Sequence, residues 1–187
     1  QLALSKIELY RNTSGFVAPD QLTLLDQTTT VDLANLNLFQ TPFDSDASRK
    51  MWYRSMLWLA VAAVDAGERG DTATANTYAQ HMITAAQKYP DPGSATPFNL
   101  AWSLVLGWDA GTVIRRSQAL LCLSSYTGVE PVRALLRMHA DALVDSERYG
   151  GPPKRRVSNA GAFANLTLLE ISKALNEPEY RRIAVER

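Results

Sequence analysis

The chain has little of the chemistry that builds metal sites and covalent cross-links. Its 187 residues include one cysteine, Cys122, and two histidines, His81 and His139. A single cysteine cannot form a disulfide within the chain, and so few soft ligands give no recognisable zinc site. The sequence therefore predicts no metal and no cofactor, and it leaves the redox compartment open.

An excess of one charge and a long apolar run are also lacking. Lysine and arginine total 19, as do aspartate and glutamate, so no overall field draws the chain to nucleic acid or to an anionic membrane. The longest apolar run, from Met56 to Val64, is far shorter than the roughly 20 residues that span a bilayer. No basic-then-apolar signal sequence opens the chain. We expect neither a nucleic-acid partner nor a membrane span, and any polyanion site must be local.

The first 45 residues differ in pattern from the rest. They are rich in threonine and alternate polar with apolar residues in pieces such as Thr28 to Leu38, which suits extended structure or loops. We interpret residues 1–45 as an irregular lead-in.

From residue 46 onward the pattern is helical. Apolar residues recur at helical spacing, and the segments begin at capping residues or prolines and end at glycine, asparagine or proline. The expected helices run from Ala47 to Asp65, from Asp71 towards Pro90, from Asp109 to Gly128, from Pro131 through Leu143, from Ser158 to Asn176, and onward from Pro178. Short loops between them favour antiparallel neighbours. The prediction is an all-α fold of antiparallel helical hairpins in residues 46–187, forming part of an (α/α) toroid that is incomplete at its C-terminal end.

Four short elements in this helical region share an order and spacing with a known family. They are the helix containing Trp52 to Leu59, a Trp-x-x-x-Thr-x-x-x-Arg element at Trp108, Thr112 and Arg116, a His-x-x-x-Leu element at His139 and Leu143, and Asn159-Ala160-Gly161 at a helix start. The chain resembles the helical toroid domain of heparinase II/III-like polysaccharide lyases. In that family the last element reads Asn-His-Gly, so the asparagine and the glycine match and the histidine does not.

The resemblance implies β-elimination on a polysaccharide that contains uronic acid. A base removes the C5 proton, and that proton becomes acidic only when the charge of the neighbouring carboxylate is shared. Asn159 is the expected catalytic residue, because its amide and the positive end of its helix would both bind that carboxylate. In family members a tyrosine or histidine is the base and acid. The tyrosine lies well downstream of this motif, beyond Arg187.

Each site residue also has a structural interpretation. Asn159 can be a simple helix cap, because Ser158 and Asn159 are both good capping residues. Ala160 stands where the family has histidine, and this difference has three interpretations. It is an engineered inactivation, a natural loss of activity, or a sign that the motif aligns differently and another histidine acts. His139 lies on an apolar helix face, where a hydrogen-bonded core role is more common than catalysis, and His81 suits a solvated role near the end of its helix.

The expected substrate-binding residues are Trp108, Arg116, His139 and Arg156. Tryptophan can stack on a sugar ring, and arginine can bind a sugar carboxylate through two hydrogen bonds. Each of these residues has an alternative role. Trp102 and Trp108 can instead fill the core, and Arg115 or Arg116 can form an internal ion pair with Asp109 or Asp141. The turn that contains Arg156 can be a solvent-exposed basic turn without a ligand.

Two function classes therefore stand. The first is a polysaccharide lyase toroid acting on an acidic polysaccharide, and the second is a catalytically inactive helical module that binds carbohydrate or serves as a scaffold. A helical-repeat interaction domain is disfavoured because no period of 34 to 47 residues is found. Family members act largely outside the cytoplasm, so the resemblance implies a periplasmic or secreted protein, which a lone cysteine permits without supporting.

Overall fold

A computed structural model describes residues 14–17, 20–38, 40–43, 46–88, 108–145, 149, 151–152 and 158–187. Over these ranges the chain is mostly helical, with one small antiparallel sheet near the start. The expectation of a predominantly helical protein is confirmed. None of the helices within these ranges has the length and apolar character needed to cross a bilayer.

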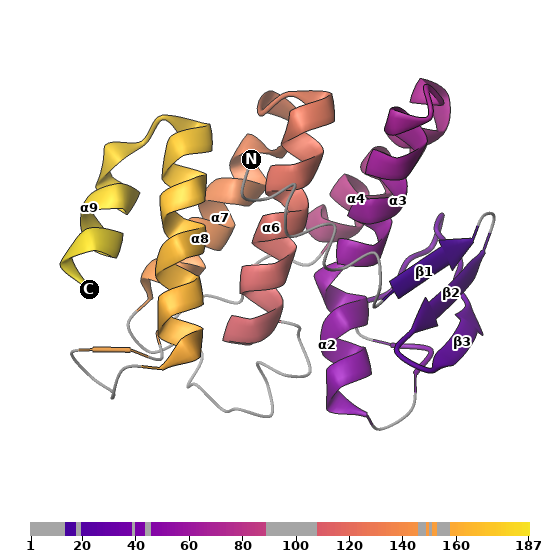
Figure 1. The fold of residues 1–187 in the computed structure, drawn as a ribbon, viewed down its shortest axis with the longest axis horizontal. Helices are drawn as coiled ribbons and strands as arrows, with labels where there is room; N and C mark the ends of the chain where they lie inside the picture. The colour runs from indigo at the N-terminus through magenta and orange to yellow at the C-terminus, as the bar shows by residue number, and fades with distance from the viewer. Residues whose placement is uncertain are drawn as a thin grey trace.

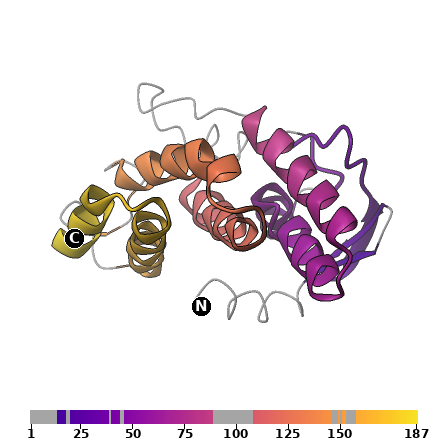
Figure 2. The ribbon, with the colours of Figure 1, turned by 90° about the horizontal axis from the view of Figure 1, so that it is seen from above.

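The helices pair as antiparallel hairpins arranged side by side (Figure 1). Helix α3 packs against α4, α6 packs against α7, and α8 packs against α9. Helices α3, α6 and α8 form one layer, and α4 and α7 both lie on the same side of it (Figure 2). The bounds are α2 Ala47–Ser55, α3 Leu57–Glu68, α4 Thr72–Gln87, α6 Ala110–Thr127, the 3-10 turn η1 Glu130–Val132, α7 Arg133–Val144, α8 Asn159–Leu175 and α9 Pro178–Glu186.

The helix starts follow the capping residues read from the sequence. A side-chain oxygen of the capping residue accepts a hydrogen bond from a backbone N–H three residues later, which satisfies one of the free donors at a helix start. The capping residues are Asp46, Asp71, Asp109 and Ser158, with N···O distances of 2.8, 3.1, 2.9 and 3.1 Å. The predicted starts of α2, α4, α6 and α8 are thus confirmed.

The predicted helix from Ala47 to Asp65 is in fact two helices. Met56 adopts a left-handed conformation, with φ 55°, and separates α2 from α3. Side chains around the break donate hydrogen bonds to the backbone carbonyls that lose their helical partners. Ser55 Oγ donates to the Trp52 carbonyl at 2.7 Å, and Trp58 Nε1 donates to the Tyr53 carbonyl at 3.1 Å. The apolar spacing of a buried helix gives no sign of such a break, because both halves remain in the core.

The prediction of an irregular lead-in is wrong for residues 14–17, 21–24 and 27–30. Strands β1 Ser14–Val17, β2 Gln21–Leu24 and β3 Gln27–Thr30 form an antiparallel sheet in the order β1-β2-β3. Leu22 and Leu24 are fully buried and belong to the same hydrophobic cluster as the helices. In β2 the alternation of polar and apolar residues covers only four residues. Strands this short are marginally stable alone, and packing against the helices supplies the missing stability.

Candidate functional site

Three of the residues singled out as substrate-binding come together in the structure. Trp108 precedes α6, Arg116 lies on α6, and His139 lies on α7. The Arg116 guanidinium lies over the Trp108 ring at 4.6 Å, and the Trp108 and His139 ring centroids are 4.8 Å apart. Arg116 Nε donates a hydrogen bond to His139 Nε2 at 2.8 Å. We call Trp108, Arg116 and His139 the arginine–histidine cluster.

The cluster fixes the protonation of His139. Its Nδ1 lies 2.7 Å from the Leu135 carbonyl and its Nε2 faces the Arg116 N–H, so Nδ1 carries the proton and Nε2 accepts. Burial lowers the pKa of His139 well below its ordinary value, and the Arg116 charge lowers it further, against an opposing effect of the Leu135 carbonyl. The imidazole is therefore neutral, and its basic nitrogen is already occupied.

The cluster also ties α2 to the rest of the core. Arg116 donates to the Arg54 carbonyl at 3.3 Å, and the Arg54 side chain donates from Nε to the Leu38 carbonyl at 3.0 Å. Burial lowers the pKa of Arg54, while the Asp109 carboxylate acts in the opposite direction. Trp108, Arg116 and His139 are each at most 2% exposed. A ligand could touch any of the three only after protein atoms had moved aside.

Asn159 is placed differently, at the exposed start of α8. Ser158 Oγ accepts from the Gly161 N–H at 3.1 Å, so Ser158 is the N-cap and Asn159 is the first helical residue. The side chain of Asn159 is exposed. Phe163 and Leu166 follow at the spacing that puts them on the same helix face as Asn159, and they are 49% and 45% exposed.

Phe163 was missed as a site candidate. From the sequence it was one of many apolar residues in a buried-looking helix, whereas the structure buries the opposite face of α8 through Ala164, Leu168 and Ile171. The four-residue spacing from Asn159 was the available signal. Beside Asn159, Ala160 is also exposed and carries no group able to transfer a proton.

Other predicted contacts have mixed outcomes. Arg156, with its neighbours Lys154 and Arg155, lies outside the described residues, as does Trp102. Arg115 stacks on Trp52 at 5.0 Å and donates to the Gly111 carbonyl at 3.0 Å. The two suggested carboxylate partners bind elsewhere: Asp109 accepts from the Thr112 hydroxyl at 2.6 Å, and Asp141 accepts from the Tyr180 hydroxyl at 2.8 Å.

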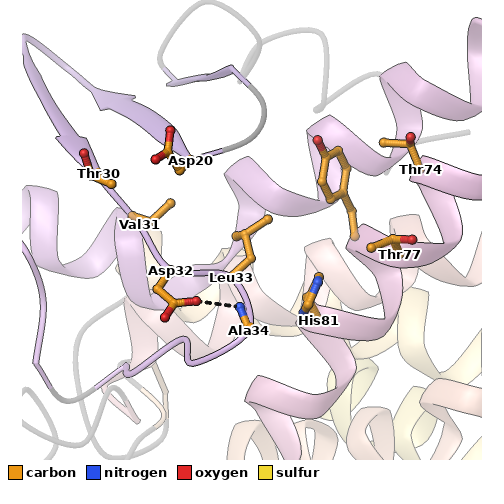
Figure 3. A pocket seen from close by; sticks show the side chains of 10 residues that line it. Asp20, Thr30, Val31, Asp32, Leu33, Ala34, Thr74, Thr77 and His81 are labelled. Atoms are coloured by element: carbon orange, nitrogen blue, oxygen red, sulfur yellow. Dashed lines mark hydrogen bonds between the residues drawn. The ribbon is translucent and has the colours of Figure 1, made fainter.

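A second site lies among residues that were not predicted to bind a ligand. An open groove of about 590 Å³ separates the segment after β3 from α4, and His81 lines it (Figure 3). Sequence reasoning assigned His81 a solvated role near a helix end, but the structure places it on the groove-lining face of α4. The signal was present in the spacing of Thr74, Thr77, Tyr78 and His81, which is that of one helix face. Within the described ranges no group of three or more histidine, cysteine, aspartate or glutamate side chains could hold a metal ion.

The two sites thus differ in character, with an amide and an aromatic ring exposed at the start of α8 and a groove of mixed polar and apolar lining beside α4. Comparison of the chain with protein-family models, with curated proteins and with solved structures gave no match. The sequence pattern and the geometry of the sites therefore carry the functional interpretation.

Proposed function

We propose that the chain is part of an (α/α) toroid that binds a uronic-acid-containing polysaccharide and cleaves it by β-elimination. The order of the Trp52, Trp108, His139 and Asn159 elements suggests this function, and the side-by-side antiparallel hairpins are the architecture on which such a toroid is built (Figure 1).

The observation that carries the proposal is that Ser158, and not Asn159, caps helix α8. Because Ser158 caps α8, the Asn159 amide is not consumed by the helix and faces solvent. An amide N–H and the positive end of a helix both favour a carboxylate as its charge changes during proton abstraction. Phe163, one turn further along the same face, offers a ring on which the sugar can stack.

In this mechanism the chain's own residues bind and polarise the uronate. The Asn159 amide donates to the carboxylate, which stabilises the negative charge that develops when the C5 proton leaves. The electron pair of that C–H bond forms the C4–C5 double bond and the 4-linked sugar departs. In the family that the sequence resembles, a tyrosine or histidine accepts and returns the proton. The arginine–histidine cluster fixes α6 to α2 and α7 within the same helical array.

One observation favours a second candidate, a carbohydrate-binding module without catalysis. Ala160 stands where the family has histidine, and the basic nitrogen of His139 is engaged by Arg116. A protein with the Asn159 amide and no proton acceptor would bind the uronate without cleaving it.

The test uses a panel of uronate polysaccharides and two readouts, binding by calorimetry and the ultraviolet absorbance of the unsaturated uronate product. Asn159→Ala is expected to weaken binding about tenfold, the loss of one hydrogen bond to a charged group. It should leave the free energy of unfolding nearly unchanged, whereas Ser158→Ala should lower it by about 1 kcal/mol.

Asn76→Ala, which removes an exposed amide on α4, is the matched control. Equal binding by wild type and Asn159→Ala would sink the proposal, and binding without product would favour the non-catalytic module.

Restoring the family's histidine separates the two candidates further. Ala160→His adds an imidazole beside Asn159 at an exposed position, so the new side chain costs little stability. If the site is otherwise complete, product formation should rise. Ala162→His, also exposed on α8, should have no such effect, and an equal response of the two variants would contradict a catalytic role for this position.

A further inference from the structure

The groove beside α4 is a built site that the uronate proposal does not use. Its volume of about 590 Å³ lies in the range of roughly 300–1,000 Å³ that holds small ligands. One wall is α4 and the other is formed by Asp20, by Thr30 at the end of β3 and by residues 31–34 after it (Figure 3). It lies at the sheet end of the hairpin array, far from the start of α8 (Figure 1).

The α4 wall is polar where a helix packed on protein would be apolar. Thr74, Thr77, Tyr78 and His81 line the groove from one face of the helix, and each has a hydroxyl or an imidazole. The Thr77 hydroxyl also donates to the Ala73 carbonyl at 2.9 Å. The Tyr78 ring is held edge-on by Phe16, with centroids 5.5 Å apart, and is only 9% exposed. Among the described residues none hydrogen-bonds the Tyr78 hydroxyl or the His81 ring, so both remain available to a ligand.

The opposite wall is acidic. Asp32 is held in a turn in which its carboxylate accepts from the Ala34 N–H at 3.0 Å and from the Asn35 side-chain amide at 2.8 Å. The Asn35 side-chain hydrogen bond, foremost among several contacts, lowers the pKa of Asp32, so this carboxylate is ionised at neutral pH. Asp20 adds a second carboxylate, and among the described residues that line the groove there is no lysine or arginine.

We propose that this groove binds a sugar unit that carries no negative charge, with a preference for one bearing an amine. The carboxylates can accept hydrogen bonds from sugar hydroxyls, the hydroxyls and the imidazole can both accept and donate them, and the part-exposed Leu33 side chain suits the C–H face of a ring. An ammonium group gains from the two carboxylates, whereas a uronate is repelled by them. The groove therefore selects the opposite charge from the site at Asn159, and it does not depend on that site.

The test is titration of the isotope-labelled full chain with glucose, glucosamine and glucuronate, followed by amide and imidazole NMR shifts. These probes share one ring and differ in charge. Glucosamine is expected to shift the resonances of Thr74, Thr77, Tyr78 and His81 and to bind about threefold to fivefold more tightly than glucose, the worth of an exposed ion pair. Glucuronate should bind more weakly than glucose.

Two variants separate the charge effect from the shape of the groove. Asp20→Asn keeps the side-chain size and should reduce glucosamine's advantage over glucose, with the Asp32 carboxylate supplying the remainder. Asp26→Asn removes a carboxylate on the β2–β3 turn, outside the groove, and should leave the advantage intact. The proposal is overturned if no probe shifts the α4 resonances, if glucuronate binds as tightly as glucosamine, or if Asp26→Asn has the same effect as Asp20→Asn.

Discussion

At the scale of single residues, the arginine–histidine cluster combines a buried cation with a neutral imidazole. Arg116 is charged at any ordinary pH, and the structure compensates its burial with the Trp108 face, His139 Nε2 and the Arg54 carbonyl. A protonated His139 would lose the acceptor that Arg116 needs and place two cations in contact. The cluster is consequently stable only while His139 stays neutral.

This predicts a pH dependence of stability. The pKa of His139 is lower in the folded chain than its ordinary value of 6.5, so below pH 6.5 the unfolded chain binds more protons than the folded one. The free energy of unfolding should fall by up to about 1.4 kcal/mol for each pH unit below 6.5 and stay level above it, as far as His139 is concerned. Urea unfolding at several pH values measures this. In His139→Gln the decline should largely disappear, and an unchanged slope would show that His139 is not its source.

Two adjacent arginines should differ in their contribution to stability. Arg116→Met leaves His139 Nε2 and the Arg54 carbonyl without their donor in the core, so we expect a loss of about 2–4 kcal/mol. Arg115→Met loses a stacking contact with Trp52 at a partly exposed position and should cost about 1 kcal/mol or less. Denaturant midpoints of the two variants compare them directly. Equal losses would contradict a specific role for the buried cluster.

At the scale of elements, caps and breaks were not equally predictable. Asp71, Asp109 and Ser158 each stand just before a helical apolar pattern, so their local chemistry marks the start of a helix. The break at Met56 has no glycine or proline to mark it. It exists because the Ser55 and Trp58 side chains satisfy the backbone around it, and that requires the folded core.

The β2–β3 hairpin carries strain that a substitution should relieve. Its two-residue loop places Leu25 at φ 57°, a region that favours glycine, and leaves the side chain 49% exposed. Leu25→Gly is expected to stabilise the protein by about 0.5–1 kcal/mol, because the strain removed exceeds the added flexibility of the unfolded chain. Thermal unfolding checks this. Leu25→Ala keeps the strained backbone and should give no gain, so a gain from both would point to a different cause.

At the scale of the whole molecule, the sheet and the helices share one core. Leu22 and Leu24 of β2 belong to the same hydrophobic cluster as Leu168 of α8. The division at residue 45 thus separates two patterns in the sequence and does not separate two cores.

A shared core predicts one cooperative unfolding transition. Leu22→Ala and Leu168→Ala each empty a fully buried position and should cost about 2–5 kcal/mol. Both should shift the same transition, followed by circular dichroism of the helices and by tryptophan fluorescence. If Leu22→Ala left the helical transition in place, the sheet would be an independent unit.

The sequence by itself determined the helical class, the capped helix starts and the position of His139 on an apolar helix face, because spacing and capping act between residues a few positions apart. Only the tertiary structure decided where the chemistry lies. It brought Trp108, Arg116 and His139 together in the core, it left Asn159 and Phe163 exposed on one helix face, and it set α4 opposite Asp20 and Asp32 to form a groove. These outcomes depend on contacts between residues far apart in the chain, and a local pattern carries no information about which of its faces a distant element will cover.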